Sequence, residues 1–159
     1  PFPSPNPDGT RFFDADRPEL ELAAATQPAF AISIRRRETF LSKTGEAPIG
    51  LEMRELSRRA KGRFANGLDW DPQLDFDERR HRGRLIADAG FDGVVFRPVE
   101  RPSGLCVSVL KGHVLERAVQ RDHFKFVWDG SRVSTVYSFG SGVQYSPKDL
   151  CGIDQVLAA

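Results

Sequence analysis

The sequence GFDGVVF occupies residues 90–96 and follows directly on a helical pattern over about residues 77–89. Asp75 or Asp77 is placed to cap this helix, acidic residues occupy its first turn, and Gly90 stands where a helix commonly ends in a left-handed residue. The last three residues of the run are apolar and predict a short buried strand. This helix–turn–strand unit indicates a domain of mixed α and β structure.

The chain downstream of this unit is rich in strand signals. Residues 105–110 form another largely apolar run. Residues 124–128 and 132–139 flank the dipeptide Asp129-Gly130. An Asp-Gly pair between two such runs is the strongest short-range signal of a β-hairpin. We therefore predict a strand over 105–110 and a hairpin over 124–139.

The N-terminal half has one clear helix start. Thr26 is predicted to be the N-cap, with Pro28 in the first turn. The buried stripe expected for this helix consists of Ala29, Phe30, Ile34 and Leu41. Four other segments are assigned only coarsely: 20–25 as a strand or the approach to a helix, 51–56 as a strand or a helix, 66–75 as a loop, and 143–159 as a weak final strand and a tail.

The length of 159 residues suits one hydrophobic core. Proline occupies positions 1, 3, 5 and 7, so residues 1–9 lack donors for a central strand and are predicted to form an extended arm. Residues 10–159 are predicted to form a single α+β domain with a mixed β-sheet core and flanking helices.

Composition and charge exclude several classes of protein. The formal net charge is +1, which argues against electrostatic capture of nucleic acid or of an acidic membrane surface. No apolar run approaches the roughly 20 residues that span a bilayer, and no signal-peptide pattern is present. Two cysteines in a chain of this length do not make a disulfide scaffold, and we expect free thiols. These observations predict a cytoplasmic protein with neither nucleic acid nor membrane as a partner.

A metal site is not expected. The three histidines lack the spacing of metal ligands relative to one another or to cysteine. Three aspartates lie between residues 69 and 75, but Leu74 stands where a calcium-binding EF-hand loop beginning at Asp69 needs glycine.

Three stretches in a fixed order resemble the C-terminal half of RES domains. They are GFDGVVF at residues 90–96, RPSGLCV at 101–107 and FVWDG at 126–130. In that family a helix leads into a Gly-(Tyr/Phe)-Asp-Gly strand, a turn rich in Pro and Gly, a strand with a small residue such as Cys, and a late strand ending in Trp-Asp-Gly. The sequence GTRF at residues 9–12 is similar to a Gly-Arg-Phe-like segment near the family's start. The resemblance then covers most of the chain.

RES domains have a fold related to that of ADP-ribosyltransferases, so the resemblance implies a RES-like or ADP-ribosyltransferase-like sheet core. The family degrades NAD by phosphorolysis or hydrolysis of the nicotinamide–ribose bond, and many members are toxins held in check by an antitoxin. The resemblance therefore implies NAD as substrate, no metal, and an antitoxin or a target protein as partner. It also implies action in the cytoplasm, either of the producing cell or of a target cell that receives the domain as an effector.

The resemblance also assigns ligand-binding residues. Arg11 matches the family's arginine for the NAD pyrophosphate, a group that the bidentate guanidinium fork neutralises well. Arg97 and Arg101 flank the turn where the family's active site lies. Together with Phe12 and Phe96 they complete the expected cofactor-binding set.

The catalytic positions depart from the family pattern. The family's glutamate falls near Ile32 or Ser33, and its serine falls at Pro98, which has no hydroxyl. Cleavage nevertheless requires a carboxylate to support the positive charge that develops on the ribose. The nearest carboxylates are Glu38 and Glu100, and we predict that one of them is catalytic.

Three hypotheses follow from these departures. The chain is an active NAD-degrading enzyme, a catalytically degenerate pseudoenzyme that binds a protein partner, or a mono-ADP-ribosyltransferase that modifies a protein. The family's tyrosine falls near Glu21, which adds a further departure. An enzyme requires a carboxylate that faces Arg11 in the folded cleft, whereas a binding module can fill the cleft with apolar side chains.

Overall fold

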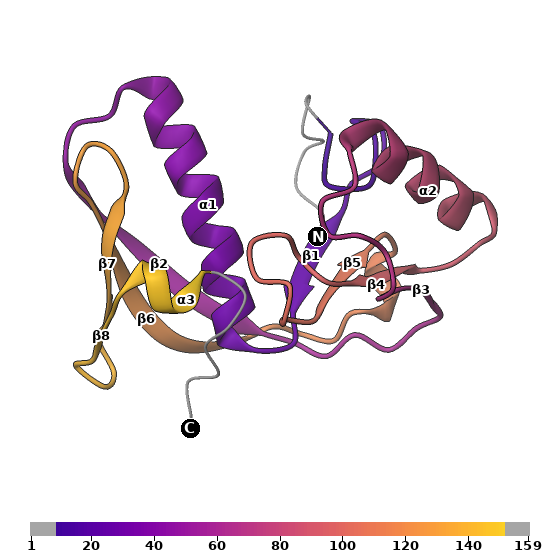
Figure 1. Ribbon diagram of the computed structural model, residues 1–159. Coiled ribbons are helices and arrows are strands. Elements are labelled where there is room, and N and C mark those ends of the chain that lie inside the picture. Colours follow the sequence, from indigo (N-terminus) through magenta and orange to yellow (C-terminus); the bar gives the residue numbers. More distant parts are fainter. Residues whose placement is uncertain (1–8, 152–159) are drawn as a thin grey trace.

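The computed structural model describes residues 9–151. Residues 1–8 of the arm predicted over 1–9, and residues 152–159 of the predicted tail, lie outside the described residues. The fold is α+β, with two four-stranded sheets. Sheet A has the strand order β1-β5-β4-β3 and sheet B the order β2-β6-β7-β8. Figure 1 shows α1 beside sheet B at one end of the molecule and α2 over sheet A at the other. The elements are β1 Leu20–Ala23, α1 Thr26–Thr44, β2 Ile49–Ser57, β3 Phe64–Gly67, α2 Phe76–Asp88, β4 Gly93–Phe96, β5 Cys106–Val109, the 3-10 turn η1 Gly112–Val114, β6 Val119–Trp128, β7 Val133–Ser138, β8 Gln144–Tyr145 and α3 Pro147–Leu150.

Helix α1 begins one residue earlier than predicted, because Ala25 and not Thr26 is its N-cap. Its N-cap is Ala25, which has no capping side chain, and the Thr26 hydroxyl instead donates to the Glu55 carboxylate across to β2. The helix stops at Gly45, whose φ of 64° is left-handed and allows its N–H to bond the Leu41 carbonyl. The predicted stripe is largely confirmed, because Phe30, Ile34 and Leu41 are all buried, while Ala29 is half-buried.

Sheet B supplies the core beneath α1. The predicted hairpin at Asp129-Gly130 is confirmed, and β6 begins five residues before the predicted arm. Phe124, Phe126 and Trp128 point inward and pack with Phe30 and other apolar residues of α1. The indole N–H of Trp128 donates to a backbone carbonyl at 3.0 Å, so its one polar group is satisfied.

Sheet A forms the second core with α2 and the segment before β1. Strands β3 and β4 are parallel and are joined by α2, whereas β4–β5 and β1–β5 are antiparallel. Asp75 caps α2 by accepting from the Glu78 N–H at 2.8 Å, as predicted. Gly83 allows α2 to approach the chain at Phe12, because a Cβ there would lie 1.9 Å from the Phe12 carbonyl oxygen. The rings of Phe12 and Phe96 meet edge to face in this core.

The two coarse assignments in the N-terminal half become strands. The segments 20–25 and 51–56 contribute to β1 and β2. Asn66 and Gly67, predicted to open a loop, belong to β3, and α3 follows the expected final strand. No helix within residues 9–151 combines the length and the apolar character needed to cross a bilayer. Cys106 and Cys151 are not bonded to each other.

Candidate functional site

The centre of the candidate site is the guanidinium of Arg11, which lies between two carboxylates. Arg11 Nε and Nη2 donate to Glu21 at 3.3 and 3.2 Å, and Nη2 donates to both oxygens of Glu100 at 2.8 and 3.0 Å. The side chains of Arg11, Glu21 and Glu100 are only 10%, 5% and 12% exposed. Two carboxylates, those of Glu21 and Glu100, therefore face Arg11.

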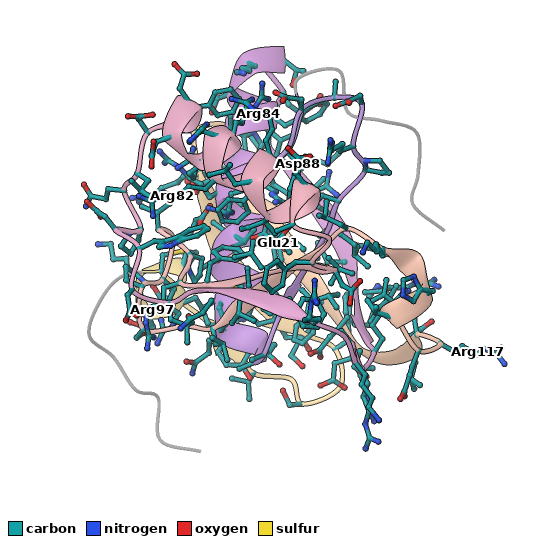
Figure 2. All side chains as sticks on the ribbon, turned by 90° about the vertical axis from the view of Figure 1, so that its right-hand side faces the viewer. Glu21, Arg82, Arg84, Asp88, Arg97 and Arg117 are labelled. Atoms are coloured by element: carbon teal, nitrogen blue, oxygen red, sulfur yellow. The ribbon has the colours of Figure 1, made fainter. Side chains whose placement is uncertain are left out.

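Three segments far apart in the sequence build this cluster. Arg11 precedes sheet A, Glu21 lies on β1, and Glu100 lies in the turn between β4 and β5. Because β1 and β4 both pair with β5, the sheet brings Glu21 and the turn at Glu100 to neighbouring positions. In Figure 2, Glu21 is labelled near the centre of the molecule, below α2 in that view.

Burial and charge act in opposite directions on Arg11. Burial is the largest single effect and lowers its pKa, but the charges and hydrogen bonds of Glu21 and Glu100 together outweigh it and raise the pKa. Arg11 is therefore held in its cationic form. Its guanidinium carbon also lies 5.2 Å from the centre of the Phe96 ring, which forms the floor below it.

A cavity of about 440 Å³ opens beside this cluster. Besides Arg11, Glu21 and Glu100, it is lined by Gly9, Thr10, Glu19, Arg36 and Arg79. Arg36 extends from α1 and pairs with Glu21, although its own side chain is 59% exposed. Three arginines and three glutamates thus line one hollow.

Glu19 is the least satisfied group of the cavity wall. Both of its carboxyl oxygens are buried, and neither makes a hydrogen bond of good geometry. Burial raises the pKa of Glu19, and the charge of Glu21 adds to this. The hydroxyl groups of Ser108 and Thr10 and the backbone N–H of Phe12 lie close enough to lower the pKa in part. A buried carboxyl with a raised pKa in a cleft is typical of functional sites.

A second cavity, of about 450 Å³, is also lined by Glu21. Its lining includes the apolar side chains of Phe30, Met53 and Phe124 and the polar side chain of Ser33 on α1. Ser33 is one of the two positions where the RES resemblance places the family's glutamate. Glu21 is therefore the one residue common to the linings described for these two cavities.

The structure brings together only some of the predicted site residues. Arg11 and Glu100 meet, and Phe12 and Phe96 lie buried beneath them. Arg97 is exposed and lies at the edge of the molecule in Figure 2. Its Nη1 donates a long hydrogen bond to the Pro102 carbonyl at 3.5 Å.

Glu38 and Arg101 have structural partners instead. Glu38 accepts from the Val133 N–H at 2.9 Å and lines a different cavity beside β7. Arg101 is 4% exposed and donates to the Leu150 carbonyl at 2.7 Å, which holds α3 in place. The structure therefore places Glu38 in another cavity, and Arg101 against α3.

Four charged residues of the cavity wall were not predicted as site residues: Glu19, Glu21, Arg36 and Arg79. The spacing of Glu19 and Glu21 carried a usable signal, because residues two apart on an extended strand share one face. No comparable signal existed for Arg79, which reaches the cavity from α2.

Two further observations concern the buried thiol and the possible metal ligands. Burial raises the pKa of the Cys106 thiol to about 12, with Glu21 adding to the effect, so this cysteine is not an activated nucleophile. Over residues 9–151, no three side chains of His, Cys, Asp or Glu are arranged to hold a metal ion.

The sequence matches a curated protein over nearly its whole length. No family model matches the sequence. The chain is 45% identical over 159 residues to "Uncharacterized protein y4oC" of Sinorhizobium fredii, an alignment that covers 99% of this chain and 69% of that protein.

Proposed function

The chain belongs to the same family as the Sinorhizobium fredii protein y4oC, and we propose that it is a RES-like domain with an ADP-ribosyltransferase-like fold that acts on NAD. The proposed reaction is cleavage of the nicotinamide–ribose bond by phosphate or water. The observation that carries the proposal is the cluster of Arg11, Glu21 and Glu100 at the junction of two cavities. The motif resemblance of residues 90–130 supports NAD as the substrate.

The chemistry requires a fixed negative charge near the ribose. As the bond breaks, its electron pair moves to the nicotinamide nitrogen and positive charge develops on the ribose. Glu21 borders both cavities and is the better placed of the two carboxylates to face that charge. Arg11 contacts both Glu21 and Glu100 and acts as a positioning residue that fixes their orientation.

The test measures nicotinamide release from NAD by the purified chain, with and without phosphate. We expect release by the wild type and a loss of about 100-fold or more in Glu21→Gln, because fixed electrostatic groups contribute effects of that order. Glu38→Gln is the matched control, since it makes the same substitution beside a different cavity, and it should leave turnover unchanged. If folded wild-type protein releases no nicotinamide, the proposal fails.

One observation favours a second candidate, a non-catalytic module that binds a protein such as an antitoxin. The position of the family's serine is occupied by the buried Pro98, and Nε and Nη2 of Arg11 already donate to the protein's own carboxylates. Absence of turnover in the folded chain would support this candidate. Transfer of label from NAD to a protein, without release of free ADP-ribose, would indicate a mono-ADP-ribosyltransferase.

A further inference from the structure

Sheet B has one buried face and one open face. The buried face carries Phe124, Phe126 and Trp128 of β6, which pack in one core with residues of α1 and α3. Figure 1 shows both helices on the same side of the sheet. Neighbouring residues of a strand point to opposite faces, so the residues between these aromatic side chains point away from the helices. The outer face of sheet B is formed by Glu52, Arg54, Arg121, His123, Lys125, Tyr137 and Phe139.

Three rings form a connected group on this outer face. The ring centres of His123 and Phe139 lie 4.8 Å apart, and those of Tyr137 and Phe139 lie 5.3 Å apart. The strand pairing fixes this arrangement, because the Phe139 N–H donates to the His123 carbonyl at 2.9 Å. Phe139 is nevertheless 47% exposed. An exposed ring that is held in place by other rings offers a flat surface on which another π-system can stack.

Cations surround these rings. Arg121 and Lys125 lie two residues before and after His123 on β6, and Arg54 is paired with His123 from β2. All three cations are exposed. The carboxylate of the outer face is that of Glu52, which is 71% exposed and lies 3.6 Å from the His123 Nε2. The outer face therefore carries three permanent cations and one carboxylate.

The basic character continues beyond the two strands. A bridge between Ala60 and Leu115 places the segment after β2 beside the segment before β6. Figure 2 shows Arg117 of the second segment projecting from the edge of the molecule. The cations that these two segments add are Arg58, Arg59, Lys61 and Arg117. The expectation of no nucleic-acid partner rested on the net charge of +1, which is an average over the whole chain and hides this concentration of cations.

We propose that the outer face of sheet B binds single-stranded nucleic acid, with unpaired bases stacked on Phe139 and Tyr137 and phosphates beside Arg54, Arg121 and Lys125. A single strand supplies flat bases for the exposed rings and regularly spaced phosphates for the cations. An acidic peptide or an anionic membrane matches the cations but offers the rings no flat π-surface. The bases of a duplex stack on one another and do not reach the rings.

This inference is separate from the proposed cleavage of NAD. Phe139, Tyr137 and the cations of β6 line neither of the two cavities that Glu21 borders. A strand bound on the outer face therefore occupies a surface on the opposite side of sheet B from α1.

The first experiment measures the binding of labelled oligonucleotides to the whole chain by fluorescence anisotropy. The probes are oligo-dT and oligo-U strands of about 12 nucleotides, a length within the usual range of single-strand sites, and a duplex of the same length. We expect a single strand to bind about tenfold or more tightly than the duplex, because only unpaired bases can stack on the rings. A preference for oligo-dT or for oligo-U supports the proposal and identifies DNA or RNA as the partner. No binding of either strand, or equal binding of the duplex, would overturn the proposal.

Phe139→Ala tests the stacking. We expect it to weaken binding of the single strand about tenfold, the size of effect found when a stacking ring is removed. Phe40→Ala is the matched control, because Phe40 is 58% exposed on α1 and lies away from the outer face. If Phe139→Ala does not fold, Phe139→Leu replaces it, since leucine keeps apolar bulk and lacks the ring. Unchanged affinity in a folded Phe139 variant, or an equal loss in Phe40→Ala, would contradict the stacking and overturn the proposal.

The salt dependence of binding tests the cations. Arg121→Gln and Lys125→Gln should each reduce the slope of log affinity against log salt concentration by about 0.7, the value for one phosphate contact on a single strand. Arg37→Gln, an exposed arginine on α1, is the control and should leave the slope unchanged. An unchanged slope in both β6 variants would overturn the proposal. Displacement of the strand by poly-glutamate at equal charge concentration would show that the surface recognises charge alone, and would also overturn it.

The two proposals fail independently. Phe139→Ala should release nicotinamide from NAD at the wild-type rate, because Phe139 lies outside both cavities. Strand binding that depends on Phe139 in a chain that does not cleave NAD would overturn the proposed function alone. Cleavage of NAD by a chain that binds no single strand would overturn this inference alone.

Discussion

Arg11→Met is the substitution whose effect on stability follows most directly from the site. It leaves the carboxylates of Glu21 and Glu100, 5% and 12% exposed, without the cation they share. Removing one member of a buried ion pair costs about 3–5 kcal/mol, because the remaining charge stays buried. Arg36 remains on Glu21 but is largely exposed and offsets only part of the loss. We therefore expect a decrease of about 3 kcal/mol in the free energy of unfolding.

A double-mutant cycle with Glu100→Gln separates the ion pair from other effects. Glu100→Gln alone should cost about 1.5–3 kcal/mol, the range for hydrogen bonds to charged groups. In the double variant no unpaired charge remains at Glu100. The free energy lost by the double variant should therefore be smaller than the sum of the two single losses by about 1–2 kcal/mol. Urea unfolding followed by circular dichroism measures all four proteins. Additive losses, or an Arg11→Met protein within about 0.5 kcal/mol of the wild type, would refute the ion-pair account.

Three further changes test other parts of the structure. Gly83→Ala should lower the free energy of unfolding by about 3 kcal/mol, because the added Cβ would lie 1.9 Å from the Phe12 carbonyl oxygen. A variant as stable as the wild type would contradict the close packing of α2 on Phe12. Because the pKa of Glu19 is raised in the folded protein, its contribution to stability is complete below the unfolded-state pKa of 4.5 and is lost as pH rises through the folded-state pKa. Glu19→Gln should therefore be more stable than the wild type above that pH. A difference between the two urea midpoints that stays constant across pH would contradict this prediction. Arg101→Met removes a buried donor from the Leu150 carbonyl and should lower the stability by about 1–3 kcal/mol, measured by thermal unfolding. An unchanged stability would show that this hydrogen bond does not hold α3 in place.

The start of α2 and the hairpin between β6 and β7 were predicted from the sequence, because each depends on residues that are close together in the chain. Asp75 caps α2, and Asp129-Gly130 joins β6 to β7, as expected. Capping and hairpin formation involve residues within a few positions of each other, so short-range signals suffice. The segment at 51–56 was ambiguous because a short apolar run suits either a strand or a buried helix, and only pairing with β6 decided it.

The Arg11 site shows a similar division. The resemblance of the sequence to RES domains pointed to Arg11, and the search for a carboxylate pointed to Glu100, which the structure places 2.8 Å away. The same search named Glu38, which lies beside β7 because α1 continues past the cavity toward the far end of sheet B. Distance along a helix does not show which cavity a side chain enters.

The sequence alone determined the α+β class, the cap of α2, the hairpin and the identity of the central arginine, since each depends on nearby residues or on a motif in fixed order. Only the tertiary structure decided that Glu19, Arg36 and Arg79 share a cavity with Arg11. These side chains come from a strand approach and two helices, and they meet because β1 pairs with β5 and α2 packs closely on Phe12. Such convergence depends on long-range pairing and packing, which leave no local signature in the chain.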